Sequence, residues 1–248
     1  MQRTSNAKRI VMLAISLFAA AAFAALGVWQ LERRVWKLAL IEAVETRIHA
    51  EPAPPPPPSA WGGVSAAKDQ YRRVVTTGHF LNARETLVRT ATEFGPGYWV
   101  MTPLEQADGT LILVNRGFVP ERLAPRSARP QSLPTGTVRV TGLLRMSEPE
   151  GRFLRANRPD QDRWYARDVA AIARARGLPA MAPYFIDAEA PSVSAPGASA
   201  WPRGGLTIVA FPNNHLTYAA TWFGLCLLSL FGFAMFWRQG TDTQTADA

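Results

Sequence analysis

Residues 216–237 read LTYAATWFGLCLLSLFGFAMFW, an uncharged stretch of 22 residues that stops at Arg238. An α-helix rises about 1.5 Å per residue, so a helix of this length crosses the roughly 30 Å hydrocarbon core of a bilayer. A buried helix of a water-soluble protein is the alternative, but this helix would carry Trp and Phe on every side. The stretch therefore predicts a transmembrane helix over residues 215–237.

A second uncharged stretch follows the basic N-terminus, where residues 10–28 read IVMLAISLFAAAAFAALGV. It is also long enough to span a bilayer. A cleaved signal peptide is the alternative, because Ala22-Phe23-Ala24 would suit a small-x-small cleavage site. However, apolar residues keep a helical period to about residue 48. We therefore expect an uncut transmembrane helix over residues 10–28 that continues outward as an amphipathic helix.

The region between the predicted spans contains short runs of β-forming residues separated by Gly and Pro. We expect one extramembrane domain over residues 59–212, built as a sheet or a small barrel. It contains one predicted helix over residues 167–176, with Asp168 near its start and Gly177 just past its end. The predicted strands are residues 71–80, 86–91, 98–104, 111–119, 138–146, 184–187 and 206–211.

Residues 52–58 read PAPPPPP, which predicts a polyproline II segment. At about 3.1 Å per residue it would be a stiff spacer between the outer helix and the domain. A proline-rich ligand for a partner domain is the alternative, but it would need flanking specificity residues. The fold class is thus an α+β membrane protein, with two transmembrane helices flanking a β-rich domain.

Composition and motifs exclude several classes of protein. The net charge of +8 comes from singly scattered cations, so no nucleic-acid surface is predicted. Cys226 is the sole cysteine, which excludes an intramolecular disulfide and any multi-thiolate metal site. Phosphate-loop, dinucleotide and nucleophile-elbow motifs are absent. A serine hydrolase with His79 as its base stays open as a remote alternative.

His215 lies at the edge of the second predicted span, within the sequence PNNH. On a helix it shares a face with Tyr218, Trp222 and Cys226. In one interpretation, His215 lies among the lipid headgroups and bonds to nearby carbonyls. In the other, its neutral imidazole is an axial ligand of heme iron and the aromatic face covers the porphyrin.

Four cations flank the spans on the same expected side of the membrane. Arg33, Arg34 and Lys37 follow the first span, and Arg203 precedes the second. They could pair with heme propionates. Alternatively, they are interfacial anchors that hold the helices at the bilayer surface.

Several blocks of sequence together resemble the Surfeit-locus family of cytochrome c oxidase assembly proteins, over residues 26–237 and in the family's order. Any one block alone would be a weak indication. The blocks are LGVWQLERRVWK (26–37), YRRVVTTGHF (71–80), GYWVMTPL (97–104), VNRGFVP (114–120), WPRGG (201–205) and NNHLTYAATWFGL (213–225).

The resemblance implies a non-catalytic assembly factor that supports insertion of heme a into the catalytic subunit of aa-type cytochrome oxidase. The family's heme-linked His corresponds to His215, which favours the ligand interpretation. Tyr218, Trp222, Arg203, Arg33 and Arg34 are the further heme-binding candidates. The implied partners are the oxidase catalytic subunit, heme a synthase and the lipid bilayer.

The expected location is a bacterial plasma membrane, because the short N-terminus leaves no room for a mitochondrial transit peptide. A basic N-terminus before the first hydrophobic segment usually stays inside the cell. We therefore expect a multi-pass protein with residues 1–9 and 238–248 in the cytoplasm and the domain in the periplasm. The alternative function is a scaffold that holds apo-oxidase at the membrane without heme.

Overall fold

The computed structural model describes residues 2–149, 155–190, 201–207, 211 and 213–245. The chain divides into two compact units. A helical unit consists of Met1–Ala43 and Ala210–Ala248, and a sheet unit consists of Val44–Val209. The predicted fold class, two candidate membrane helices flanking a β-rich domain, is confirmed.

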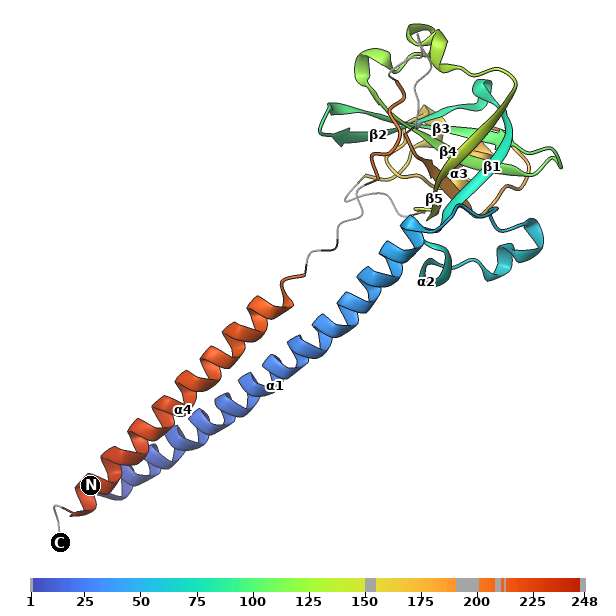
Figure 1. Ribbon diagram of the computed structural model, residues 1–248. Helices are drawn as coiled ribbons and strands as arrows, with labels where there is room; N and C mark the ends of the chain where they lie inside the picture. Colours follow the sequence, from blue (N-terminus) through green and yellow to red (C-terminus); the bar gives the residue numbers. More distant parts are fainter. Residues whose placement is uncertain (1, 150–154, 191–200, 208–210, 212, 246–248) are drawn as a thin grey trace. The chain divides into compact units, whose positions relative to one another are not determined.

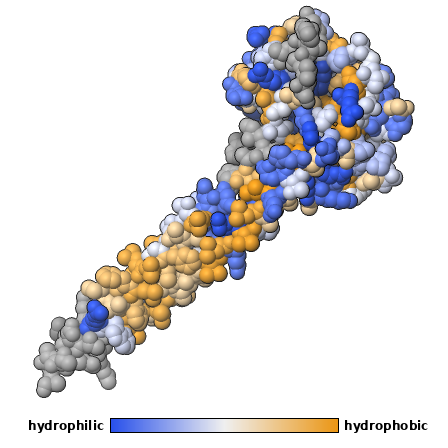
Figure 2. All heavy atoms as spheres, in the orientation of Figure 1, coloured by the Kyte–Doolittle hydropathy of each residue, from blue (hydrophilic) through white to orange (hydrophobic). Residues whose placement is uncertain are grey.

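The helical unit pairs the first part of α1 (Gln2–His49) with α4 (His215–Thr245). Both helices are long and apolar enough to cross a membrane, over Ile10–His49 and His215–Arg238. They run antiparallel (Figure 1), and α1 contains no Pro and only one Gly, so nothing in its sequence interrupts it. Their outer surface is largely apolar (Figure 2), as lipid contact requires.

The sheet unit contains six strands in the order β1-β5-β6-β4-β3-β2. An additional pairing of β1 with β3 closes five of them into a ring, and β2 extends from β3 outside it. Neighbours are antiparallel except β4 and β6. The strands are β1 (Arg73–Phe80), β2 (Thr86–Thr92), β3 (Gly95–Glu105), β4 (Leu111–Pro120), β5 (Thr137–Met146) and β6 (Tyr184–Ala188).

Strand β4 shows how the core is built. Successive side chains of a strand point to opposite faces. Leu111 and Leu113 therefore join a cluster with Trp164 and the helix α3 (Val169–Ala175), whereas Ile112 and Val114 join a second cluster with β1 and β5. Because β4 is buried on both faces, its sequence is almost continuously apolar.

Helix α3 confirms the predicted helix but begins two residues later than predicted, at Val169. Asp168 is its N-cap, and its carboxylate accepts a hydrogen bond from the Ala171 backbone N–H. The remaining helical segments are short: η1 (Pro58–Gly63), α2 (Ala66–Asp69), η2 (Asn82–Arg84), η3 (Glu121–Leu123), η4 (Arg126–Ala128), η5 (Pro130–Ser132) and η6 (Pro159–Gln161). Of the predicted strand at 206–211, residues 206, 207 and 211 are not in a strand, and residues 208–210 lie outside the described part of the chain.

The proline segment, for which its composition predicts a stiff polyproline II spacer, is bonded to the sheet. Ala53 forms a parallel bridge with Val74 of β1, through backbone bonds to Arg73 and Val75. The carbonyl of Pro56 accepts hydrogen bonds from the Tyr184 hydroxyl (2.7 Å) and the Trp61 indole (3.1 Å). Proline has no N–H but keeps its carbonyl, so a polyproline strand can still be fixed by acceptor bonds along a sheet.

Candidate functional site

The candidate site lies where α4 begins, at His215. The Tyr218 backbone N–H donates to the Asn214 carbonyl (3.2 Å), so the first turn closes on the Asn-Asn pair that precedes the helix. The Oδ1 atom of Asn213 is buried and has no hydrogen-bond partner among the described residues. A polar acceptor without a partner thus lies two residues before the imidazole.

His215 is held by a residue of α1. Its Nδ1 atom lies 2.8 Å from the side-chain oxygen of Gln30. A carbonyl oxygen can only accept, so Nδ1 donates and the lone pair of the neutral ring is on Nε2. In the part of the chain that the structure describes, Nε2 has no hydrogen-bond partner. The imidazole is therefore oriented with its basic nitrogen available.

The helix pair that carries this bond is packed by small and aromatic residues. Phe23 of α1 stacks on Trp222 of α4, with ring centroids 5.7 Å apart. Ala219, one turn after His215 on α4, is buried. Gly27 faces Phe223, because a Cβ on Gly27 would lie 2.7 Å from the Phe223 ring. Close approach at glycine is the usual way for membrane helices to pack, and here it sets the distance across which Gln30 reaches His215.

The structure brings some predicted site residues together. His215, Tyr218 and Trp222 follow one another along α4, and Tyr218 remains exposed at 55%. Arg33 and Arg34 lie within the turn of α1 that follows Gln30. The Arg33 guanidinium lies over the Trp36 ring at 3.9 Å, a contact typical of residues at a membrane interface.

Arg203 belongs to the sheet unit, where its contacts are structural. Its backbone N–H and C=O pair with those of Phe118 (both 2.9 Å), and its guanidinium lies over Phe94 at 4.5 Å and Trp201 at 5.7 Å. Gly117 has φ +123°, and a Cβ there would lie 2.2 Å from the Arg203 carbonyl oxygen. The VNRGF and WPRGG segments are thus joined by the backbone bonds between Phe118 and Arg203, and only glycine at position 117 permits this close approach.

Gln30 is a residue of this candidate site that the sequence analysis did not identify. It lies seven residues after Phe23 and three after Gly27, so all three share a face of α1. A signal was available, because an uncharged polar residue on the packed face of a membrane helix calls for a partner on the facing helix. His215 could not be identified as the partner of Gln30 from sequence, because the sequence does not show which turn of α4 lies opposite Gln30.

The sheet unit also contains a buried ion network centred on Asp187, which is 4% exposed. Arg167 joins Asp187 to Glu148 and lies over the Phe185 ring at 4.6 Å. The donors to the Asp187 carboxylate are Asn115 Nδ2 (2.8 Å), Arg145 Nη1 (2.9 Å), Arg167 Nη1 (3.0 Å) and Thr207 Oγ1 (3.0 Å).

The network shifts the protonation of its members. Burial alone would raise the pKa of Glu148, but the hydrogen bonds and charge of Arg167 outweigh it, so this pKa lies below its ordinary value. Burial would likewise lower the pKa of Arg167, but Asp187 and Glu148 outweigh it and raise that pKa. Both shifts favour the charged forms of Glu148 and Arg167, which suits a structural ion pair rather than proton transfer.

Other candidate chemistry finds little support among the described residues. No group of three or more His, Cys, Asp and Glu side chains in that part of the chain could hold a metal ion. His79, the base of the hydrolase alternative, is exposed and bonds to the Thr137 hydroxyl (3.1 Å). Cys226 is a half-buried free thiol in α4.

Comparison with known proteins decides the family. Residues 17–227 match the model of the SURF1 family, a range that includes α1 from Leu17 onward, the whole sheet unit and α4 as far as Leu227. The chain belongs to the SURF1 family. The family predicted from the sequence blocks is thereby confirmed, and both Gln30 and His215 lie inside the matched region.

The chain is similar to SURF1-family proteins of several organisms, of which three illustrate the range. Surfeit locus protein 1 of Rattus norvegicus is 36% identical over 226 residues, covering 85% of this chain and 70% of the relative. The Homo sapiens protein of that name is 37% identical over 217 residues, covering 81% and 69%. A SURF1-like protein of Monosiga brevicollis is 38% identical over 227 residues, covering 87% and 83%.

Proposed function

We propose that this SURF1-family protein is an assembly factor of aa-type cytochrome c oxidase that holds heme a as cargo at the membrane edge. His215 is the proposed axial ligand of the iron. The proposal rests on the family and on one observation above all: the Nδ1 atom of His215 bonds to Gln30, so the ring is oriented and Nε2 is left available.

The residues around His215 suit such a cargo. A ligating His typically donates its other ring N–H to an acceptor that fixes the ring, and Gln30 occupies that role. Trp222 provides an aromatic surface one to two turns further along α4, and the unpartnered Asn213 oxygen can accept a hydrogen bond. Heme a supplies the oxidase with a redox-active iron porphyrin.

Arg33 and Arg34 are the proposed partners of the heme carboxylates. They follow Gln30 on α1, whereas the imidazole of His215 is on α4. Their guanidinium groups would form charge-assisted hydrogen bonds with propionates. Tyr218, an exposed aromatic residue on the same helix as His215, is a further candidate. Arg203 belongs to the sheet unit and stays a prediction from the sequence.

We further propose that the protein resides in a bacterial plasma membrane as a multi-pass protein. Both termini are cytoplasmic and the sheet unit is periplasmic in this arrangement. The basic N-terminal segment before the first apolar helix supports it. The proposed protein partners are the oxidase catalytic subunit and heme a synthase.

A complementation experiment tests the function. Cells that lack their own family member receive either the wild-type chain, His215→Ala or the matched control His79→Ala, and the heme a content of purified oxidase is measured. We expect wild type and His79→Ala to restore heme a and His215→Ala to fail while remaining in the membrane. Full restoration by His215→Ala would instead favour a scaffold that holds apo-oxidase without carrying heme.

A further inference from the structure

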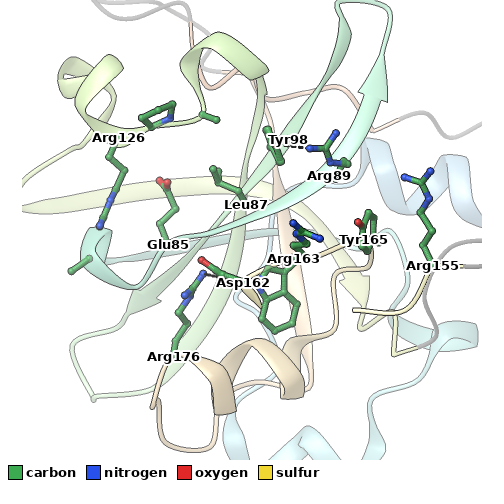
Figure 3. Close-up of a pocket in the computed structure, with 14 residues that line it drawn as sticks. Glu85, Leu87, Arg89, Tyr98, Arg126, Arg155, Asp162, Arg163, Tyr165 and Arg176 are labelled. Carbon is green, nitrogen blue, oxygen red and sulfur yellow. Dashed lines mark hydrogen bonds and ion pairs between the residues drawn. The ribbon is translucent and has the colours of Figure 1, made fainter. Parts of the chain in front are cut away.

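A hollow of about 620 Å³ lies in the sheet unit, between β2, the loop that contains η4, the segment 155–165 and the end of α3. Its size is within the range of ligand-binding pockets. Five arginines line it (Figure 3), and we call it the arginine pocket: Arg89, Arg126, Arg155, Arg163 and Arg176.

Positive charge in and behind this pocket exceeds the negative charge available to neutralise it. Glu85 and Asp162 are the lining acids. Glu85 is already committed to a buried ion pair with Arg129. Close to that pair, burial and the charge of Arg129 together lower the pKa of Arg116 to about 10, although the charge of Glu85 opposes the shift. The Nη1 atom of Arg116 is buried without a hydrogen-bond partner among the described residues.

Some of the arginines are fixed on the wall. Arg89 donates to the Tyr98 hydroxyl (2.9 Å) and pairs with Glu121 (3.2 Å). Arg176 pairs with Asp162 (2.6 Å). A guanidinium has five N–H donors, so these contacts orient the side chains without using all of their donors. Because these side chains are already ordered in the free protein, ligand binding would cost little further side-chain entropy.

Arg155 and Arg163 are available. Both are exposed, and neither forms an ion pair with any residue that the structure describes. The Arg155 guanidinium lies 5.6 Å from the Tyr165 ring, which supports it from one side. Arginine rather than lysine supplies 24 of the 27 basic residues of the chain, and its planar fork matches carboxylates in a bidentate way.

The guanidinium groups surround the hollow instead of converging on one point. In Figure 3, Arg126 and Arg176 lie on one side, Arg163 in the centre, and Arg89 and Arg155 on the other. A single small anion needs several donors directed at one position, whereas spaced carboxylates can each meet a different guanidinium. We propose that the arginine pocket docks an acidic peptide segment, rich in Asp or Glu, of a protein partner. This proposal is independent of heme binding at His215.

A binding measurement on the full-length protein in detergent tests it. The probe is a fluorescein-labelled hexaglutamate peptide, followed by anisotropy at about 50 mM salt, where charge interactions are weakly screened. The variant Arg155→Gln/Arg163→Gln removes the two available guanidiniums without touching a buried contact. We expect it to bind the peptide at least about tenfold more weakly than wild type, because two charge-assisted contacts are lost.

The matched control is Arg139→Gln/Arg174→Gln, which removes the same charge from exposed positions outside the pocket. We expect it to bind within about twofold of wild type. Equal weakening by both double variants would show non-specific attraction and overturn the proposal. So would wild-type affinity no greater than for a hexaglutamine peptide, or pocket-dependent binding of pyrophosphate without binding of hexaglutamate.

Discussion

At the scale of single residues, the hydrogen bond between Gln30 and His215 carries the functional argument. Gln30→Ala removes the acceptor that fixes the imidazole but leaves Nε2, the proposed iron-binding nitrogen, in place. Loss of such an outer partner typically costs about 10–100-fold in affinity. We expect heme a binding to weaken by that factor, measured by titration of the purified protein with the exposed Glu32→Ala as the control. Unchanged affinity would mean that Gln30 does not position His215.

Asp187 supports a second prediction at this scale, about stability. Asp187→Asn removes a charge that neutralises Arg145 and Arg167, leaving the buried Arg167 and the partly buried Arg145 poorly compensated. Breaking a buried ion pair costs about 3–5 kcal/mol. We expect the free energy of unfolding of the sheet unit to fall by that amount in urea denaturation. Asp160→Asn, at an exposed position in η6, should leave it unchanged, and a similar loss in both variants would contradict the account.

The pH dependence of stability follows from Glu148 in the same network. Its pKa is lower in the folded protein than its ordinary value of 4.5, so the unfolded chain binds the proton more tightly. The stability that Glu148 contributes is complete above 4.5 and is lost as the pH falls through the lower folded pKa. We expect Glu148→Gln to lose stability less steeply than wild type in acid. The exposed Glu105→Gln should behave like wild type, and identical acid slopes for all three proteins would contradict the assignment.

At the scale of elements, the close approach of α1 and α4 depends on Gly27. Gly27→Leu would push the Phe223 ring away and separate the helices around the Gln30–His215 bond. Overpacking of this kind costs about 1–3 kcal/mol, which lowers the thermal midpoint by a few degrees. The control is Gly224→Leu, because a Cβ on Gly224 meets nothing within 4 Å. We expect the midpoint in detergent to fall only for the Gly27 variant; equal effects would show that helix packing does not depend on Gly27.

The same elements show how far sequence reasoning reaches. Hydrophobic length predicted both apolar helices, and alternation with turn residues located β1 to β6, because these signals are local. Closure of the sheet through β1 and β3 could not be predicted, since it depends on which strand edges meet. The Gln30–His215 bond spans 185 residues, and the Asp187 network joins β4, β5 and β6, so neither has a local signature. The contacts of the proline segment could not be predicted either, because its composition says nothing of the donors that Tyr184 and Trp61 supply to the Pro56 carbonyl.

At the scale of the whole molecule, the proposed orientation makes a prediction about topology. Alkaline phosphatase is active only where its disulfides can form, outside the cytoplasm. Fused after Ala190, within the sheet unit, it should be active in bacterial cells. Fused after residue 248 it should be inactive, because α4 returns the chain to the cytoplasm. The reverse pattern would contradict the proposed periplasmic location of the sheet unit.

The central claim is that the helical unit of this SURF1-family protein binds heme a through His215. The most direct test is the absorption spectrum of the full-length protein, purified in detergent from cells that make heme a. We expect wild type and the matched control His79→Ala to carry heme a, and His215→Ala to lose most of it while keeping the same thermal stability. Equal heme a content in wild type and His215→Ala would contradict the claim.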